Sequence, residues 1–523
     1  MSINLSKLDI SVFIFYIVGI LALGVYASAK GKTTKRDYFL AGDKLPWWLI
    51  GGSIIASNIS SHSLVGIMGV AYSRGFVAVV IDWAAILIGF NALLWIFLPF
   101  YIRNGFYTVP EYLQKRFGGG ARATYTALIL LTYVFVEIGA VLYLGAYSLY
   151  SLLDIPVMSS VFILAIATGI YTIAGGLRAV IWTEMLQLVI LILGCIILSY
   201  ATITAAGGIS AVIETSKDWD LILPANDPDF PWTMYLGGTL CISIFYCATN
   251  QFIVQRTLAA KSEWHARMGV IFGNYIKFFI PLIITIPAMV APKLFPNLEK
   301  ADMIFPILVG NLLPAGLIGL VMAGLIASVM SHISGAINSS TTILTMDVYL
   351  PYFRKNATEK EAIGFGRTAG VVIIVLGIIC SSVLLSHSNK PIFLYLLNAY
   401  GFFTPGIAAM FLLGIFWKRT THAGALAAGL VTIPLSLAME FIFPFMPFMN
   451  RTGIVFWSCM LICVLVSLLT KPKPDIELQG LIWNKESLSL PIEEREQQRG
   501  LGNPFIWWAI VTAMVLYFYV RYS

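Results

Sequence analysis

Charged residues and cysteines are scarce in this sequence. Only 11% of its 523 residues are charged, against 59% that are hydrophobic, which excludes a soluble globular protein. The six cysteines lie in apolar stretches without a C-x-x-C pair or a Cys/His zinc spacing, so we expect neither disulfides nor a structural metal. There is no H-E-x-x-H motif, no phosphate-binding glycine loop and no nucleophile–base spacing, so we expect no enzyme and no cofactor. The net charge is +7, but the positively charged residues lie between apolar segments, so we expect no nucleic-acid partner.

Long apolar runs predict an all-α polytopic membrane protein. Each run is long enough to cross about 30 Å of hydrocarbon as a helix. The run at 156–174 is short, and the run at 311–346 is too long for one straight helix. The fourteen predicted spans are residues 8–29, 47–72, 76–102, 122–150, 156–174, 180–206, 233–255, 270–292, 311–346, 367–386, 391–417, 422–444, 452–470 and 504–521.

The distribution of Lys and Arg predicts the orientation in the membrane. Cytoplasmic loops are enriched in these residues, and the connection after the first span reads KGKTTKRDYFLAGDK. If that loop is cytoplasmic, the inner connections hold 24 of the 33 basic residues and the outer ones hold 8. Both termini are therefore predicted to be extracytoplasmic. The long polar connection 471–503 is expected to be a mobile cytoplasmic linker.

Polar residues interrupt two of the predicted spans. Six of the seven residues from Ser57 to Ser63 are polar, and the end of the span at 233–255, with the residue after it, reads CISIFYCATNQFIVQR. Lipid cannot satisfy such groups, so each segment is expected to face a cavity and to be locally unwound, which is typical of secondary transporters. A buried helix bonded to its neighbours would explain the first segment equally well. The two interruptions lie five spans apart, which indicates an inverted repeat of two five-helix halves.

Five ionisable residues lie in or at the edge of predicted spans. A charge in mid-bilayer costs about 2.5–3.5 kcal/mol, so each is expected to face the helix bundle with a partner. A structural ion pair, such as Lys277 with one acid, is the alternative to a functional role. Glu184 is near the inner interface, where solvation would also suffice. The five residues are Asp82, Glu137, Glu184, Lys277 and His332.

The span at 311–346 has a small polar face. Ser328, Ser331, His332 and Gly335 follow helical spacing, and Asn338 lies on or beside the same face. Hydroxyls of this kind can supply oxygen ligands to a small hard cation. They can equally form a small-residue packing face.

Several strings resemble the solute:sodium symporter family, most closely its sodium/sugar cotransporter branch. The resemblance covers essentially the whole chain in the same order. It implies a leucine-transporter-type five-plus-five inverted repeat in the second to eleventh spans, with alternating access driven by an ion gradient. The strings are YFLAGDKLPWW (38–48), ASNISS (56–61), YTVPEYLQKRF (107–117), GGLRAVIWTEMLQ (175–187), NQFIVQRTLAAKS (250–262), NSSTTILTMDVY (338–349) and PGIAAMFLLGIFWKRTT (405–421).

The resemblance implies a cation site between the first interrupted span and the ninth span. Backbone carbonyls and two adjacent hydroxyls form the main sodium site in the family, and one of those hydroxyls is an imidazole here. A neutral nitrogen is a poorer sodium ligand than oxygen, and imidazolium would repel the ion. The matching residues are Ala56, Ile59, Ser328, Ser331 and His332. A possible second cation site would use Glu184, Ser331 and Ser334, while a further family hydroxyl position is Gly335 here.

The resemblance also implies a sugar site that this sequence matches only in part. Asn58, Asp82 (usually Glu in the family) and Lys277 fall on polar sugar contacts, and Tyr246 falls on an aromatic inner gate. Four positions differ from the relatives: Ser63 replaces Gln or His, Ser243 replaces Asn, Leu397 replaces Gln and Glu137 stands at an Asn position. Lost hydrogen-bonding partners disfavour the usual pose of galactose or glucose. Another sugar, a polyol or a modified sugar is therefore an alternative substrate.

These features together predict a secondary active symporter in the cell membrane that imports a sugar-like solute with Na⁺. Proton coupling is the alternative, because His titrates near neutral pH and Glu137 and Glu184 are also in the membrane. An uncoupled transporter, or a sugar sensor or leak channel on the same fold, is a further alternative.

The expected organisation has four parts. Residues 1–46 form an N-terminal helix outside the core and a basic cytoplasmic loop, and residues 47–206 form the first repeat. Residues 207–417 form an outer loop and the second repeat. Residues 418–523 form peripheral helices with the linker 471–503.

Overall fold

The computed structural model describes residues 5–29, 34–59, 62–153, 155–216, 219–387 and 392–523. The side chains of residues 29, 62–63, 151–153, 384–387 and 392–397 lie outside this description. Within the described ranges all regular elements are helical, and the β-pairing consists of two isolated bridges. The α-helices are α1 (Lys7–Ala29), α2 (Lys35–Leu40), α3 (Trp47–Asn58), α4 (Ile67–Arg74), α5 (Val80–Ala84), α6 (Leu98–Arg103), α7 (Val109–Phe117), α8 (Gly119–Thr132), α9 (Val141–Leu153), α10 (Val157–Ala205), α11 (Ile209–Thr215), α12 (Gly238–Ser243), α13 (Gln251–Leu258), α14 (Glu263–Val290), α15 (Ile304–Leu312), α16 (Leu317–Ile343), α17 (Glu359–His387), α18 (Ile392–Phe416), α19 (His422–Ile442), α20 (Phe448–Leu469) and α21 (Pro504–Arg521).

Eleven helices in the described part of the chain are long and apolar enough to cross a membrane. The sequence predicts fourteen spans, and the difference has a structural reason. The spans predicted at 47–72 and 233–255 are each divided, since α3 ends at Asn58 and the second is interrupted at Asn250. The spans predicted at 156–174 and 180–206 run together as α10 across a kink at Gly176. The count of fourteen crossings stays a prediction.

The kink in α10 depends on a residue without a side chain. Gly176 has φ 60° and ψ −159°, a backbone conformation that is essentially restricted to glycine. A Cβ at this position would lie 2.3 Å from the carbonyl oxygen of Tyr38 in α2. The bend therefore lets α10 pass directly against the short helix α2.

Gly176→Ala is expected to lower the free energy of unfolding by at least about 1–3 kcal/mol, because the backbone is strained and α2 must also move. Thermal or denaturant unfolding of the purified protein measures this loss. Gly19→Ala in α1 is the control, since no atom lies within 4 Å of the added methyl group. Equal stability of the two variants would contradict the prediction.

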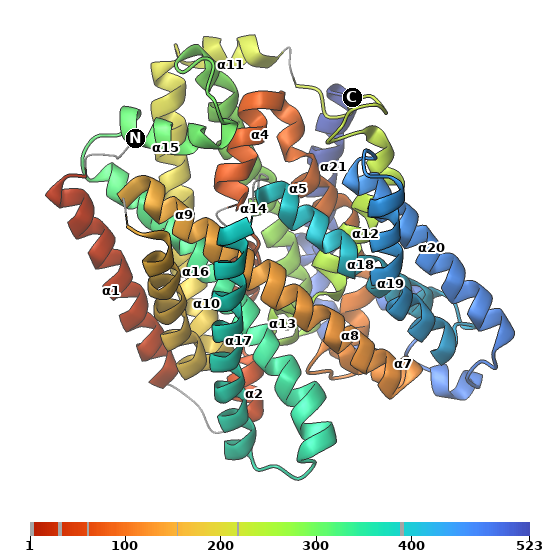
Figure 1. Cartoon of the computed structure of the whole chain (residues 1–523). Helices are drawn as coiled ribbons and strands as arrows, with labels where there is room; N and C mark the ends of the chain where they lie inside the picture. The colour runs from red at the N-terminus through yellow and green to blue at the C-terminus, as the bar shows by residue number, and fades with distance from the viewer. Residues whose placement is uncertain (1–4, 30–33, 60–61, 154, 217–218, 388–391) are drawn as a thin grey trace.

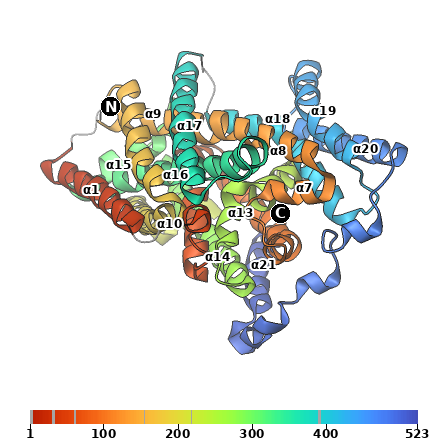
Figure 2. The same ribbon diagram turned by 90° about the horizontal axis from the view of Figure 1, so that it is seen from below.

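The central helices pack closely through small residues. A Cβ on Gly51 of α3 would lie 2.4 Å from the carbonyl oxygen of Gly269 in α14, and one on Gly273 would lie 3.4 Å from the Gly51 carbonyl. Small residues allow helix backbones to approach in a membrane, where packing replaces the hydrophobic effect between helices. Figures 1 and 2 show α1 at one edge of the molecule and α19 and α20 at the opposite edge, with α16 between them.

Both chain ends lie at the same end of the helix bundle (Figure 1). The Asp9 carboxylate accepts hydrogen bonds from the backbone N–H groups of Gly316 and Gly319, at 2.7 and 2.8 Å. The Tyr522 carbonyl accepts one from the Leu221 N–H at 2.9 Å. These contacts join the N-terminal helix to the outer end of the predicted span 311–346, and the C-terminal end to the predicted outer connection 207–232. They fit an even number of crossings, while the side of the membrane stays a prediction.

The linker 471–503 is packed against the end of the bundle opposite the chain termini. Trp483 donates its backbone N–H to the Ile415 carbonyl and its indole N–H to the Trp95 carbonyl. Glu494 accepts the backbone N–H groups of Glu263 and Trp264 at the start of α14, where a carboxylate is favoured by the helix dipole. We name this packed segment the inner strap. The sequence predicts a mobile segment here, but its composition does not reveal these backbone contacts.

Candidate functional site

The two interrupted spans meet inside the bundle. α3 ends at Asn58, after which Ile59 adopts extended backbone angles of φ −92° and ψ 107°. The second span is broken at Asn250, with φ −87° and ψ 121°, between the π-helical turn Ile244–Thr249 and α13. Arg256 of α13 reaches the hydroxyl of Ser57 on α3. The predicted interruptions are therefore present and are in contact.

The break at Asn250 is sealed by tyrosine hydroxyls. Tyr101 donates to the Ala248 carbonyl at 3.1 Å, and Tyr125 donates to the Thr249 carbonyl at 2.6 Å. Tyr133 donates to the Asn250 side chain, which also accepts the Phe252 N–H in the first turn of α13. These bonds replace the helical partners that the break removes. Nothing in the sequence distinguishes these tyrosines from ordinary core aromatics.

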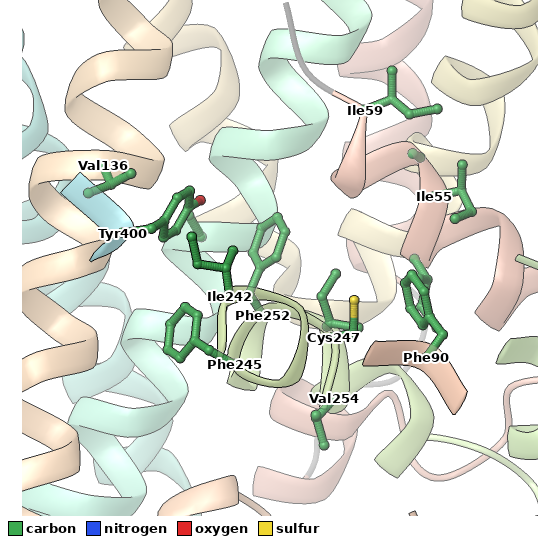
Figure 3. Close-up of a cluster of buried hydrophobic side chains, with 14 of the residues drawn as sticks. Ile55, Ile59, Phe90, Val136, Ile242, Phe245, Cys247, Phe252, Val254 and Tyr400 are labelled. Carbon is green, nitrogen blue, oxygen red and sulfur yellow. The ribbon is translucent and has the colours of Figure 1, made fainter. Parts of the chain in front are cut away.

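Apolar side chains surround this second break. Figure 3 shows Ile55 of α3 and Ile59, which directly follows it, on one side of the turn that carries Cys247, and Val136 and Tyr400 on the other. All four of these flanking residues are buried. A wall of this kind excludes water, which strengthens electrostatic interactions among the polar groups inside.

Three of the predicted solute contacts form one buried group. The Lys277 ammonium of α14 donates to Asn58 at the end of α3 and to the carboxylate of Asp82 in α5. The Lys277 side chain is 3% exposed and that of Asp82 is 21% exposed. The pair is electrically neutral, and a polar solute would have to compete for these donors and acceptors.

Glu137 and His332 bond to each other. The His332 Nδ1 lies 2.8 Å from the Ser57 carbonyl oxygen, so this nitrogen carries a hydrogen, because a carbonyl only accepts. The Nε2 lies 2.6 Å from a carboxyl oxygen of Glu137, and both side chains are at most 1% exposed. Both imidazole nitrogens are therefore engaged, and neither is directed at a cation. The sequence assigned the two residues to different ligands and did not predict their contact.

The predicted cation site contains a hydroxyl without a partner. Ala56 and Ile59 are buried at the end of α3, and Ser328 donates to the Leu325 carbonyl at 2.7 Å. The Ser331 hydroxyl is fully buried and has no hydrogen-bond partner among the described residues. A buried hydroxyl left unpaired costs about 1–3 kcal/mol, so this oxygen fits a site that a cation fills.

Both carboxylate oxygens of Glu184 accept hydrogen bonds from residues that the sequence did not indicate as partners. One carboxylate oxygen accepts from the Ser57 hydroxyl and from Arg256 Nη2 at 2.6 Å. The other accepts from the Ser53 hydroxyl and lies 3.4 Å from Arg256 Nε. Neither side chain is more than 1% exposed, so Glu184 is not solvated at the interface. No hydrogen bond joins Glu184 to Ser331 or Ser334 in the described structure.

Of the four remaining predicted solute contacts, the structure describes the side chains of two, Tyr246 and Ser243. Tyr246 lies between two other aromatic rings, 5.9 Å from Tyr400 and 6.4 Å from Phe252 between centroids. Ser243 is buried at the end of α12. The side chains of Ser63 and Leu397 lie outside the described residues.

Comparison with known proteins finds a family match over most of the chain and relatives that are about one third identical to it. The profile of the Sodium:solute symporter family matches residues 38–432. The sodium/glucose cotransporter of Vibrio parahaemolyticus is 33% identical over 508 residues, which cover 90% of this chain and 92% of that protein. The sodium/myo-inositol cotransporter 2 of Sus scrofa is 34% identical over 484 residues, which cover 84% of this chain and 71% of that protein.

Two solved structures share the fold. A Na⁺-coupled sialic acid symporter, solved in a substrate-bound outward-open state, has a TM-score of 0.79 at 22% identity and covers 89% of this chain and 99% of its own. A nucleobase-cation-symport-1 family transporter has a TM-score of 0.59 at 13% identity and covers 86% of this chain and 99% of its own.

Proposed function

Because the chain belongs to the sodium:solute symporter family, we propose that it imports a sugar or sugar-like solute by alternating access, driven by the Na⁺ gradient. The family consists of transporters, so the chain is not an enzyme. It is a multi-pass α-helical membrane protein with the leucine-transporter-type fold and broken helices. We place it in the cell membrane with both termini outside.

The observation that carries the proposal is the neutral Lys277–Asn58–Asp82 group at the end of a broken helix. Buried, mutually paired donors and acceptors suit a polyhydroxylated solute, whose hydroxyls can replace these bonds one for one. The names of the relatives, sodium/glucose and sodium/myo-inositol cotransporters, agree with this class. The proposed solute contacts are Asn58, Ser63, Asp82, Glu137, Ser243, Tyr246, Lys277 and Leu397.

Na⁺ binding would join the two halves of the proposed repeat. The proposed ligands are the carbonyls of Ala56 and Ile59 at the end of α3, the carbonyl of Ser328 on α16 and the hydroxyl of Ser331 on α16. The partnerless Ser331 oxygen supports this position. A cation held there ties α3 to α16, so its binding favours one arrangement of these helices over the other. A ligand can shift a conformational equilibrium only through such differential contacts.

The four-part organisation remains part of this proposal. Residues 47–206 and 207–417 would form the two repeats, and residues 1–46 and 418–523 would lie outside the core. The peripheral positions of α1, α19 and α20 support this division (Figure 2).

Tyr246→Ala is expected to weaken solute retention about tenfold while leaving the fold intact, because one aromatic contact contributes roughly 0.5–1.5 kcal/mol beyond its buried area. The ring contacts Tyr400 and Phe252, so its loss opens one side of the site. The measurement is equilibrium binding of the transported solute in Na⁺. Tyr246→Phe is the matched control, since it keeps the ring. Unchanged binding and transport in the alanine variant would rule out a gating role.

Proteoliposomes test the proposed function directly. D-glucose and myo-inositol are the first probes, followed by a screen of hexoses, polyols and amino sugars with and without Na⁺. Uptake against the solute gradient is expected with an inward Na⁺ gradient and not with K⁺ in its place. Uptake that ignores Na⁺ and follows a pH gradient would reject Na⁺ coupling. Uptake that only equilibrates the solute would identify an uncoupled protein.

A further inference from the structure

The Arg256 guanidinium occupies space that a missing side chain leaves open. A Cβ on Gly335 of α16 would lie 2.6 Å from Arg256 Nη2, 2.7 Å from Cε2 of the Phe252 ring and 3.2 Å from the Ser57 hydroxyl oxygen. Any side chain at position 335, including a serine, would therefore collide with the guanidinium in its present position. The absence of a side chain at Gly335 thus leaves a volume that the Arg256 guanidinium and the Phe252 ring fill together.

The guanidinium is also held by a closed set of hydrogen bonds. It donates Nε to the Ser53 hydroxyl at 2.8 Å, and Nη2 to the Ser57 hydroxyl. Both hydroxyls in turn donate to the Glu184 carboxylate, to which the guanidinium bonds directly at 2.6 Å. Nη1 donates to the Phe252 carbonyl one turn earlier in α13. The oxygens around Glu184 therefore face a positive group that belongs to the chain.

Charge reinforces this geometry. Glu184 and Arg256 are at most 1% exposed, and their charges cancel. A free cation entering beside Glu184 would meet a fixed positive charge in a water-poor interior, where like charges repel strongly. Both carboxylate oxygens of Glu184 already accept hydrogen bonds from the protein. The Ser331 hydroxyl, in contrast, is buried without a hydrogen-bond partner among the described residues.

We infer that Arg256 is a tethered cation in the place of a second coupling ion, so that one Na⁺ accompanies each solute molecule. The inference rests on the proposed function and adds its stoichiometry. Its thermodynamic consequence is measurable. At zero membrane potential, a tenfold Na⁺ gradient supports about tenfold solute accumulation with one ion and about a hundredfold with two, since each tenfold ratio adds one equal increment of free energy.

Counting bound ²²Na⁺ on the purified full-length protein tests the inference without knowledge of the solute. One saturable site per chain is expected. A count of two would overturn the inference, whereas a count of zero would overturn the proposed Na⁺ coupling itself. These outcomes keep the two proposals distinguishable.

Variants test whether the guanidinium is the excluding group. Arg256→Met with Gly335→Ser removes the tethered charge and places a hydroxyl in the vacated space, and the count is expected to rise to two. A count that stays at one in the folded double variant would overturn the role assigned to Arg256. Arg267→Met is the matched control, because it removes another buried guanidinium that is paired with a carboxylate, that of Glu263 in α14. Its count is expected to stay at one.

Glu184→Gln provides a second route that keeps the shape of the site. Glu184 does not hold the counted ion under this inference, so the variant is expected to keep one saturable Na⁺ site, with a lower affinity because the Arg256 charge loses its counter-charge. Loss of the only Na⁺ site in this variant, with the fold retained, would overturn the inference.

Discussion

Lys277→Met is expected to reduce solute uptake by about a hundredfold or more. The substitution removes a buried ammonium that bonds to Asn58 and Asp82 at once. Hydrogen bonds to charged groups are each worth about 1.5–3 kcal/mol, and a hundredfold change corresponds to about 2.7 kcal/mol. The Asp82 carboxylate would also be left beside the solute without its counter-charge. The initial rate of uptake into proteoliposomes under a fixed Na⁺ gradient measures the effect.

Two further variants separate a binding role from a structural one. Lys277→Met with Asp82→Asn removes both charges and is expected to restore stability but not uptake, because the solute contacts remain absent. Lys293→Met is the control, since Lys293 pairs with Glu214 at the exposed surface and such pairs contribute little. Normal uptake by the Lys277→Met protein would exclude Lys277 from the solute site.

Glu184→Ala is expected to lower the free energy of unfolding by about 3–5 kcal/mol, the usual cost of breaking a buried ion pair by removal of one partner. The loss arises because Arg256 would remain buried without a counter-charge and because the Ser53 and Ser57 hydroxyls would lose their acceptor. Denaturant or thermal unfolding of the solubilised protein is the measurement. A loss of this size is a large fraction of the roughly 5–15 kcal/mol by which folded proteins are typically stable.

A double-mutant cycle identifies the cause. Glu184→Ala combined with Arg256→Met removes both charges and is expected to recover most of the lost stability, since a buried pair can often be replaced by apolar groups at little cost. Additive losses from the two substitutions would mean that the pair is not coupled in the folded protein.

The broken helices could be predicted from the sequence because lipid cannot satisfy their polar residues, although a continuous helix bonded to its neighbours was the alternative for the first of them. Ser57 and Asn58 lie in an otherwise apolar span, and Asn250 interrupts another, so both breaks are visible in composition alone. The same rule makes an ion pair between Lys277 and one acid an alternative to a functional role, and the structure identifies Asp82 as that acid. In both cases the high cost of an unpaired polar or charged group in lipid limits the possible structures.

The partners of the other charges could not be predicted. Arg256 lies at the end of a predicted span, where it counts among the basic residues of an inner loop, yet it turns inward to Glu184. Glu137 and His332 are far apart in sequence and each matches a separate family position, so their mutual contact is visible only in three dimensions. Pairing depends on helix rotation and tilt, which hydropathy does not determine.

The inner strap has a consequence for how the protein is made. Arg103 and Arg267, at the end of the bundle opposite the chain termini, both donate to the Ser489 carbonyl, and Arg267 also donates to the Leu488 carbonyl. A chain synthesised from its N-terminus cannot form these bonds until almost all of it has left the ribosome. This end of the bundle is therefore completed last, and a protein truncated before the strap would present unfinished polar surface to quality-control proteases.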